Sequence, residues 1–350
     1  MQRDPSPLAR VLSARRALHF ILILALAGCA APDRGSEPHG ARPLVIDAAA
    51  SPSGLALCYS PFRAGQAPTG AQPSRDQILE DLRIIEPHWN TVRTYSSRGT
   101  TETIVELIHE HDIDIRVVVG AWIATETVLD ANGAVIEERA DARRDNLEEV
   151  AAAIRLANAF PDVVAAVSVG NETQVSWTGH PVETATLSEH IRAVRGSVSV
   201  PVTTADDFAF WISPASRPVA DEVDFIITHA YAMWNGTQLD EAVAFTQEKF
   251  RAVRQAHPGK LVLLGETGWA TTVHTEGEQA RLIKGQAGER EQAEFYSALR
   301  AWARAEGATV FYFEAFDEPW KGGAHPNEVE KHWGLFNVDR TPKAAMREGS

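Results

Sequence analysis

The chain has 350 residues, of which 44% are hydrophobic and 23% charged, and these fractions exclude a disordered chain, a collagen and a coiled coil. Its formal charge of −14 disfavours nucleic acid and anionic membrane surfaces as partners, because both bind basic patches. Two cysteines cannot form a disulfide framework, and nine tryptophans are many for one chain.

The first 28 residues are typical of a secretory signal peptide. Several arginines precede an apolar run over residues 17–27, which is shorter than the roughly 20 residues of a bilayer crossing. The run ends in Leu26-Ala27-Gly28-Cys29, which resembles the lipobox of bacterial lipoproteins. That resemblance implies lipidation of Cys29 and, with Ala30 rather than Asp next, an exported protein anchored in the outer membrane. The alternative is a plain secretory signal followed by a chance cysteine.

Residues 29–52 are rich in Pro, Ala and Gly and predict a flexible tether. The sequence shows neither a second linker nor a repeat after them, so residues 53–350 are expected to form one domain.

Short apolar, β-branched runs alternate with amphipathic stretches along that domain. The expected strands cover 55–59, 91–95, 113–120, 163–170, 200–204, 223–228, 261–265 and 309–313. The expected helices cover 75–85, 103–111, 146–160, 187–195, 239–256 and 290–305. Ser74 and Gln77 have the spacing of a capping box at the start of the first helix.

Eight buried strands with helical crossovers predict a single (β/α)8 TIM barrel, an α/β fold. The alternative, an open doubly wound sheet, usually carries a glycine-rich phosphate loop after its first strand. This position reads Cys58-Tyr59-Ser60-Pro61-Phe62, so the barrel is favoured. Residues 123–146 form a long polar insertion with a turn at Asn132-Gly133. This insertion either forms one wall of the cleft or has no part in the site.

Two glutamates end two of the predicted strands. Glu172 follows the fourth strand and Glu266 the seventh, and the active site of such a barrel lies at these strand ends. Glycoside hydrolysis uses such a pair, one carboxyl protonated and one ionised. Either glutamate alone is better explained as a solvated loop carboxylate. The two positions together favour a glycosidase.

Six ordered blocks make the chain similar to glycoside hydrolase family 17, the β-1,3-glucanases. The blocks are Tyr59-Ser60-Pro61-Phe62, Val92-Arg93-Thr94-Tyr95-Ser96, Val169-Gly170-Asn171-Glu172, Gly265-Glu266-Thr267-Gly268-Trp269, the stretch 313–321 and the stretch 330–336. The resemblance implies a retaining enzyme in which Glu172 is the acid/base, Glu266 the nucleophile and Asn171 a ligand of the sugar 2-hydroxyl. A loop asparagine bound to its own backbone is the alternative for Asn171.

Further polar residues are expected to bind substrate at the barrel mouth. Tyr231 either donates its hydroxyl to the nucleophile or simply packs at the barrel rim. Arg93, which ends the second strand with Tyr95, either holds the nucleophile's carboxylate or neutralises buried acids. A set that matches the family's cleft is assigned to substrate binding and charge balance: Glu318, Lys321 and Glu330. Glu318 and Lys321 could instead simply pair on a loop.

Three tryptophans next to candidate catalytic residues are expected to serve as flat platforms for sugar rings: Trp234, Trp269 and Trp320. The histidines show no H-x-x-x-H or H-E-x-x-H spacing, and no phosphate loop is present. We therefore expect neither a metal nor a cofactor.

The expected function is hydrolysis of β-1,3-glucan by a retaining glycosidase. Transfer of the glycosyl group to another sugar, in a glucanosyltransferase that elongates or branches the chain, uses the same residues. Two further alternatives are a non-catalytic carbohydrate-binding lipoprotein, which the intact carboxylates argue against, and a structural envelope lipoprotein, which leaves the tryptophan-lined mouth unexplained.

Overall fold

The computed structural model describes residues 40–347. The predicted signal peptide, Cys29 and the first part of the predicted tether lie outside the described residues.

Eight parallel strands close into a barrel in the order β1-β10-β9-β8-β7-β6-β3-β2. Their bounds are β1 Ala56–Cys58, β2 Thr91–Arg93, β3 Arg116–Ala121, β6 Val164–Asn171, β7 Val202–Asp207, β8 Ile226–His229, β9 Val262–Thr267 and β10 Val310–Tyr312. All but the first residue of β3 and the last of β6 are buried, as the apolar runs predict for strands covered on both faces. The predicted single (β/α)8 barrel is confirmed.

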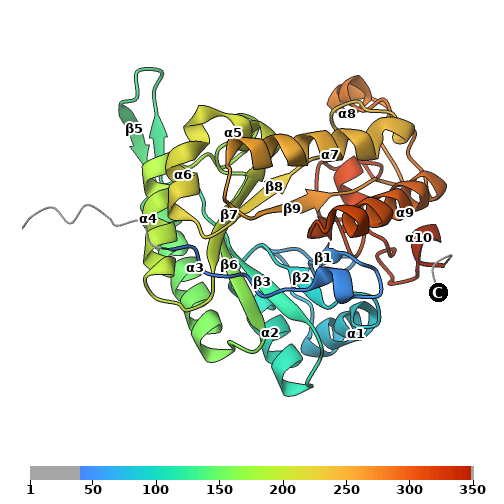
Figure 1. Cartoon of the computed structure of the whole chain (residues 1–350), viewed down its shortest axis with the longest axis horizontal. Helices are drawn as coiled ribbons and strands as arrows, with labels where there is room; N and C mark the ends of the chain where they lie inside the picture. Colours follow the sequence, from blue (N-terminus) through green and yellow to red (C-terminus); the bar gives the residue numbers. More distant parts are fainter. Residues whose placement is uncertain (1–39, 348–350) are drawn as a thin grey trace, which may run out of the picture. The chain divides into compact units, whose positions relative to one another are not determined.

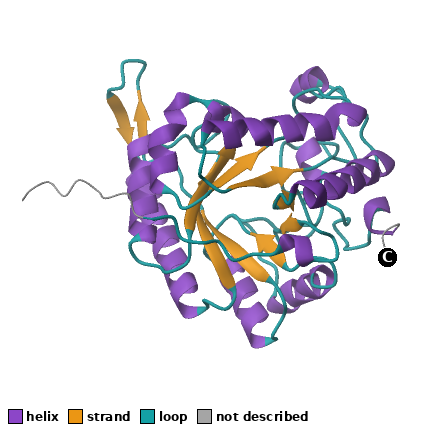
Figure 2. Cartoon of the chain, viewed as in Figure 1, coloured by secondary structure: helices purple, strands orange, loops and turns teal. Residues whose placement is uncertain are grey.

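Helices surround the barrel, as Figures 1 and 2 show. They are α1 Arg75–Ile85, α2 Thr100–Glu110, α3 Ala140–Ala159, α4 Thr184–Arg195, α5 Phe208–Ile212, α6 Arg217–Glu222, α7 Leu239–Ala256, α8 Gly277–Leu282, α9 Glu289–Glu306 and α10 Ala344–Arg347. Within the described residues, short 3-10 helices cover Ala48–Ala50, Pro214–Ser216 and Val329–Lys331. The capping box at α1 is present, because the Gln77 N–H donates to Ser74 Oγ at 3.2 Å and the Ser74 N–H donates to Gln77 Oε1 at 3.0 Å.

The insertion after β3 contains a two-stranded antiparallel hairpin, β4 Thr127–Leu129 and β5 Val135–Glu138. The predicted turn is present, with Gly133 at φ 80°, a conformation that glycine adopts without strain. In Figure 1 the hairpin extends away from the barrel.

The segment before β1 packs on the barrel. The Arg42 guanidinium donates to the carbonyl oxygens of Arg195, Val198 and Val200 at 2.6, 2.9 and 3.0 Å. These bonds satisfy carbonyl groups at the end of α4 and in the loop after it, so the chain is fixed from here on. The expectation of a flexible tether as far as residue 52 is therefore wrong for this part of it.

Among residues 40–347, no helix combines the length and the apolar character needed to cross a membrane.

Candidate active site

Both predicted carboxylates stand at the carboxyl end of the barrel. Glu266 lies in β9, and Glu172 directly follows β6. β7 and β8 lie between these two strands in the barrel. The Glu172 N–H donates to the carbonyl oxygen of Ala205 in β7 at 2.9 Å, which fixes the backbone of Glu172 just beyond its strand. The two residues therefore face the same mouth, as the strand-end argument requires.

Arg93 contacts residues at the ends of two other strands, β9 and β6. Its guanidinium donates to Glu266 Oε1 at 2.6 Å and to Asn171 Oδ1 at 2.6 Å. Arg93 is 1% exposed, so both bonds form away from bulk water, where charge-assisted bonds are strong. Of the two interpretations left open by the sequence, the contact supports the one in which Arg93 holds the carboxylate of Glu266. Asn171 binds this arginine rather than its own backbone.

The second oxygen of Glu266 faces β8 and the loop after it. Tyr231 donates its hydroxyl to Glu266 Oε2 at 2.8 Å, as expected from the sequence. The fully buried His229, which the sequence analysis did not single out, places Nδ1 3.4 Å from the same oxygen. Burial opposes the charge on Glu266, but the contacts with His229 and Arg93 outweigh it and hold the pKa of Glu266 below its ordinary value. Glu266 is thus an anion at neutral pH.

Glu172 has the opposite environment. Burial, and next the negative charge of Glu266, raise the pKa of Glu172 well above its ordinary value. Two buried acids at the end of β7 add to this effect, although sequence analysis did not single them out. Burial raises the pKa of Asp206 to about 7 and that of Asp207 to about 6. Glu172 is therefore protonated at a pH at which Glu266 is ionised.

The loop after β10 contains a buried charge cluster. Lys321 Nζ lies 2.7 Å from Glu314 Oε2 and 2.5 Å from Glu318 Oε2. Glu318 is fully buried and also accepts a bond from Trp320 Nε1 at 2.9 Å. Glu318 therefore balances charge and does not present its carboxylate to a substrate. The predicted role in charge balance is kept, and the predicted role in substrate binding is corrected. Glu314, which the sequence analysis overlooked, has its pKa raised well above the ordinary value by burial.

The three tryptophans chosen as sugar platforms differ in exposure. Trp320 is 38% exposed, and Trp234 is half-buried with its Nε1 donating to Glu330 Oε1 at 3.1 Å. Trp269 is fully buried, donates to the Gln286 carbonyl oxygen and packs on a ring of α9, so its assignment as a platform is wrong. Half-buried Tyr95 lies with its ring centre 4.7 Å from the guanidinium carbon of Arg93. Sugar contact by Trp234, Trp320 and Tyr95 stays a prediction.

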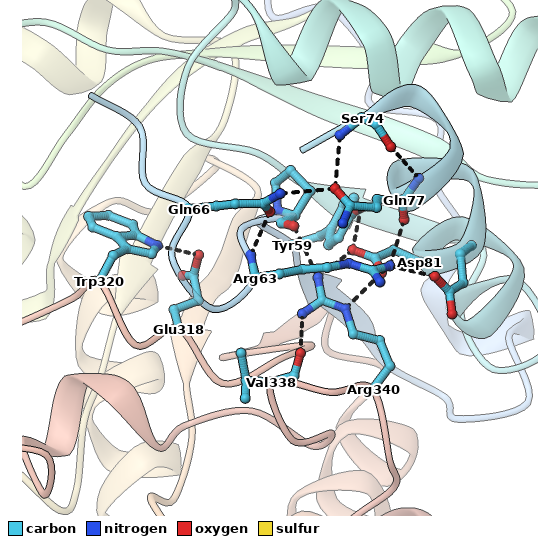
Figure 3. Close-up of polar contacts among 12 residues, drawn as sticks. Tyr59, Arg63, Gln66, Ser74, Gln77, Asp81, Glu318, Trp320, Val338 and Arg340 are labelled. Atoms are coloured by element: carbon cyan, nitrogen blue, oxygen red, sulfur yellow. Dashed lines mark hydrogen bonds and ion pairs between the residues drawn. The ribbon is translucent and has the colours of Figure 1, made fainter. Parts of the chain in front are cut away.

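A second buried ion cluster supports the loop next to Trp320, and Figure 3 shows its members around Asp81. Arg340 donates to both carboxylate oxygens of Asp81, at 2.8 and 2.6 Å, and Arg63 donates to Oδ1 at 2.9 Å. Tyr59, the first residue of a family block, donates its hydroxyl to Asp81 Oδ2 at 3.2 Å. Tyr59 therefore contributes to the structure of the β1–α1 loop.

The arrangement places a protonated carboxyl group and a carboxylate anion at one barrel mouth. A glycosidase needs these two groups for displacement at the anomeric carbon of a sugar. In the part of the chain from residue 40 to 347, no three His, Cys, Asp or Glu side chains are placed to hold a metal ion.

Comparisons with known proteins agree with this chemistry. Residues 56–334 match the model of the BtgE/BtgC glycoside hydrolase domain. A glucan 1,3-beta-glucosidase of Arthroderma benhamiae is 28% identical over 83% of this chain and 94% of its own length. One of Schizosaccharomyces pombe is 27% identical over 77% and 79%. The crystal structure of an endo-laminarinase from Formosa Hel1_33_131 has a TM-score of 0.71 and 27% identity, covering 84% of this chain and 86% of that one.

Proposed function

We propose that this chain, which belongs to the BtgE/BtgC glycoside hydrolase family within the β-1,3-glucanase-like family 17, cleaves β-1,3-glucan with retention of configuration. The single observation that carries the proposal is the pair of glutamates at one barrel mouth. Glu266 is held by Arg93 and Tyr231, whereas Glu172 has no cation partner among the described residues, which favours an ionised Glu266 and a protonated Glu172. The names of the relatives, glucan 1,3-beta-glucosidases and an endo-laminarinase, support the linkage.

The reaction proceeds in two displacements. First, an oxygen of Glu266 attacks the anomeric carbon, the bond to the glycosidic oxygen breaks, and Glu172 gives its proton to that leaving oxygen. Glu172, now a carboxylate, then takes a proton from water while the water oxygen attacks the same carbon and releases Glu266. Before the attack, Arg93 and Tyr231 hold the two oxygens of Glu266 in place. Two inversions leave the product in the original β configuration.

Hydrolysis is the main outcome that we propose, and transfer to a sugar hydroxyl is the second candidate, because the acceptor hydroxyl can take the place of water in the second step. Incubation of laminarihexaose alone, followed by mass spectrometry of the products, separates the two. Only shorter products indicate hydrolysis, and products longer than the substrate indicate transfer. Intact laminarihexaose after prolonged incubation with the parent enzyme contradicts both, and a Glu266→Ala variant serves as the inactive control.

We also propose that the protein is exported and anchored by lipid through Cys29. The apolar run over residues 17–27 and the Leu26-Ala27-Gly28-Cys29 motif support this proposal. A Cys29→Ser variant expressed in a Gram-negative bacterium should move from the membrane fraction to the soluble fraction. A variant that stays with the membrane as the parent does contradicts anchoring through this cysteine.

A further inference from the structure

We propose that His180 is a positioning residue for the acid/base Glu172, acting through the peptide bond between Asn171 and Glu172. The inference rests on the assignment of Glu172 made above. His180 lies in the loop between β6 and α4, eight residues after Glu172 in the chain. It does not belong to any of the sequence blocks that indicate the family.

The peptide group that precedes Glu172 is held from both sides. Its carbonyl oxygen, on Asn171, lies 3.0 Å from His180 Nε2, and its N–H donates to the Ala205 carbonyl oxygen at 2.9 Å. A carbonyl oxygen can only accept, so His180 Nε2 carries the proton and donates. The plane of this peptide is therefore set by two bonds, one from β7 and one from the loop.

The conformation of Glu172 explains why these two hydrogen bonds to the peptide group matter. Glu172 has φ 49°, in the left-handed region that residues other than glycine seldom occupy. Gly170, two residues earlier, has φ 80°, so the backbone is irregular on both sides of Asn171 at the end of β6. A left-handed conformation at a residue with a side chain persists only where its surroundings impose it. Rotation of the Asn171–Glu172 peptide would swing the Glu172 carboxyl away from its place in the mouth.

The imidazole of His180 is itself fixed in orientation. Its Nδ1 lies 2.8 Å from Thr178 Oγ1, and with Nε2 protonated it accepts the threonine hydroxyl proton. The ring also stacks on Trp122, which follows β3, with centroids 4.3 Å apart and planes 16° apart. Burial lowers the pKa of His180, so the neutral ring, with this tautomer, is the form at neutral pH.

The loop closes so that His180 reaches back to the strand end. The Val182 N–H donates to the Thr173 carbonyl oxygen at 3.1 Å, and the Gln174 N–H donates to Asp206 Oδ2 at 2.9 Å. These bonds tie the loop to itself on both sides of His180 and to β7 just after Glu172. His180 thus completes the contacts that fix the backbone at the acid/base, and it does not contact a reacting atom.

The test compares two substrates that differ in their need for an acid. A laminari-oligosaccharide has a sugar alkoxide as its leaving group and needs the proton of Glu172, whereas a 2,4-dinitrophenyl β-laminaribioside releases a stable phenolate without one. The measured quantity is kcat/KM, which reports the first displacement only. In His180→Ala we expect kcat/KM to fall roughly 10- to 100-fold on the oligosaccharide and less than about threefold on the aryl glycoside. His180→Gln, whose amide keeps an N–H donor near the place of Nε2, should recover most of the loss.

Two controls separate positioning from general damage. His109→Ala removes a histidine that is about half exposed on α2 and should leave both substrates unaffected. Equal losses on the two substrates in His180→Ala, or no loss on the oligosaccharide, overturn the proposal. If the parent cleaves neither substrate, the proposed function fails, and the positioning is then decided by a crystal structure of His180→Ala. The Asn171–Glu172 peptide must have rotated in that structure, and an unmoved peptide overturns the inference.

Discussion

Replacement of Arg93 by methionine probes the electrostatics of the site most sharply. Methionine fills a similar volume without charge, and it removes both 2.6 Å bonds, to Glu266 Oε1 and to Asn171 Oδ1. Glu266 is then left as a buried carboxylate without its cation. Removal of one partner of a buried ion pair costs roughly 3–5 kcal/mol in the free energy of unfolding. Because the lost ion pair favoured the ionised form, the pKa of Glu266 rises in the variant.

The sign of the pH dependence follows from the direction of the shift. In the parent, the pKa of Glu266 is lower when folded than when unfolded, so its ionised form adds stability above the unfolded pKa. That contribution is lost as the pH falls through the folded pKa. In Arg93→Met the contribution is absent, so the deficit in unfolding free energy relative to the parent is largest at neutral pH. It shrinks as the pH falls and Glu266 of the variant takes up a proton.

Urea unfolding at pH 7 and pH 4, together with the pH profile of kcat/KM, measures both effects. We expect a larger loss of stability at pH 7 than at pH 4, and an acidic limb of kcat/KM that moves to higher pH. Arg93→Lys keeps a cation without the planar fork that reaches two partners, so it should give intermediate values. Equal destabilisation at both pH values with an unmoved acidic limb refutes the reasoning and leaves Arg93 a packing residue.

Three further predictions concern the acid, the nucleophile and the substrate platform. Glu266→Ala should lose several orders of magnitude in kcat on laminari-oligosaccharides, and azide should restore turnover with an α-glycosyl azide as product; near-parent turnover excludes Glu266 as nucleophile. Asp206→Asn removes a negative charge near Glu172, so the alkaline limb of kcat/KM should move to lower pH, whereas activity at pH 5, where Asp206 is mostly protonated, should change little. An unmoved limb contradicts the coupling. Trp320→Ala should raise KM for laminarihexaose roughly three- to tenfold with little change in kcat, and an unchanged KM excludes this ring as a platform.

The regular part of the fold could be predicted from the sequence, because long elements carry a clear periodicity. The helix expected over 290–305 spans Glu289–Glu306, and the one over 75–85 has these bounds in the structure. α3 begins at Ala140 rather than at 146, because its first turns are polar and mostly exposed and so lack the apolar stripe. The helices α5, α6 and α8 have five or six residues and are too short for periodicity to reveal them.

The two carboxylates could be predicted because each follows an apolar run, where a barrel places its chemistry. The residues that surround these carboxylates were harder to predict from the sequence. His229 acts on Glu266, a residue of another strand, and a single sequence holds no signal for such a pair. Glu314 pairs with Lys321 of the same loop, seven residues along the chain, within a stretch that the family resemblance already covers. Asp206 and Asp207 did carry a signal, since two acids follow the strand predicted over 200–204.

Trp269 shows the limit of adjacency as an argument. It is close to Glu266 in the chain, but the segment after β9 turns its indole towards α9 and the Gln286 carbonyl group instead of the mouth. Similarly, the Pro- and Ala-rich composition before β1 suggested a free tether, whereas Arg42 binds three carbonyl groups and Leu44 and Ile46 pack against the core.

Trapping of the covalent intermediate tests the central claim most directly. A 2-deoxy-2-fluoro-laminaribiosyl fluoride slows both displacements but keeps a good leaving group, so the glycosyl-enzyme accumulates and can be located by peptide mass spectrometry. The account predicts one adduct, on the peptide that contains Glu266. An adduct on Glu172, or no adduct together with an α-configured first product, contradicts it.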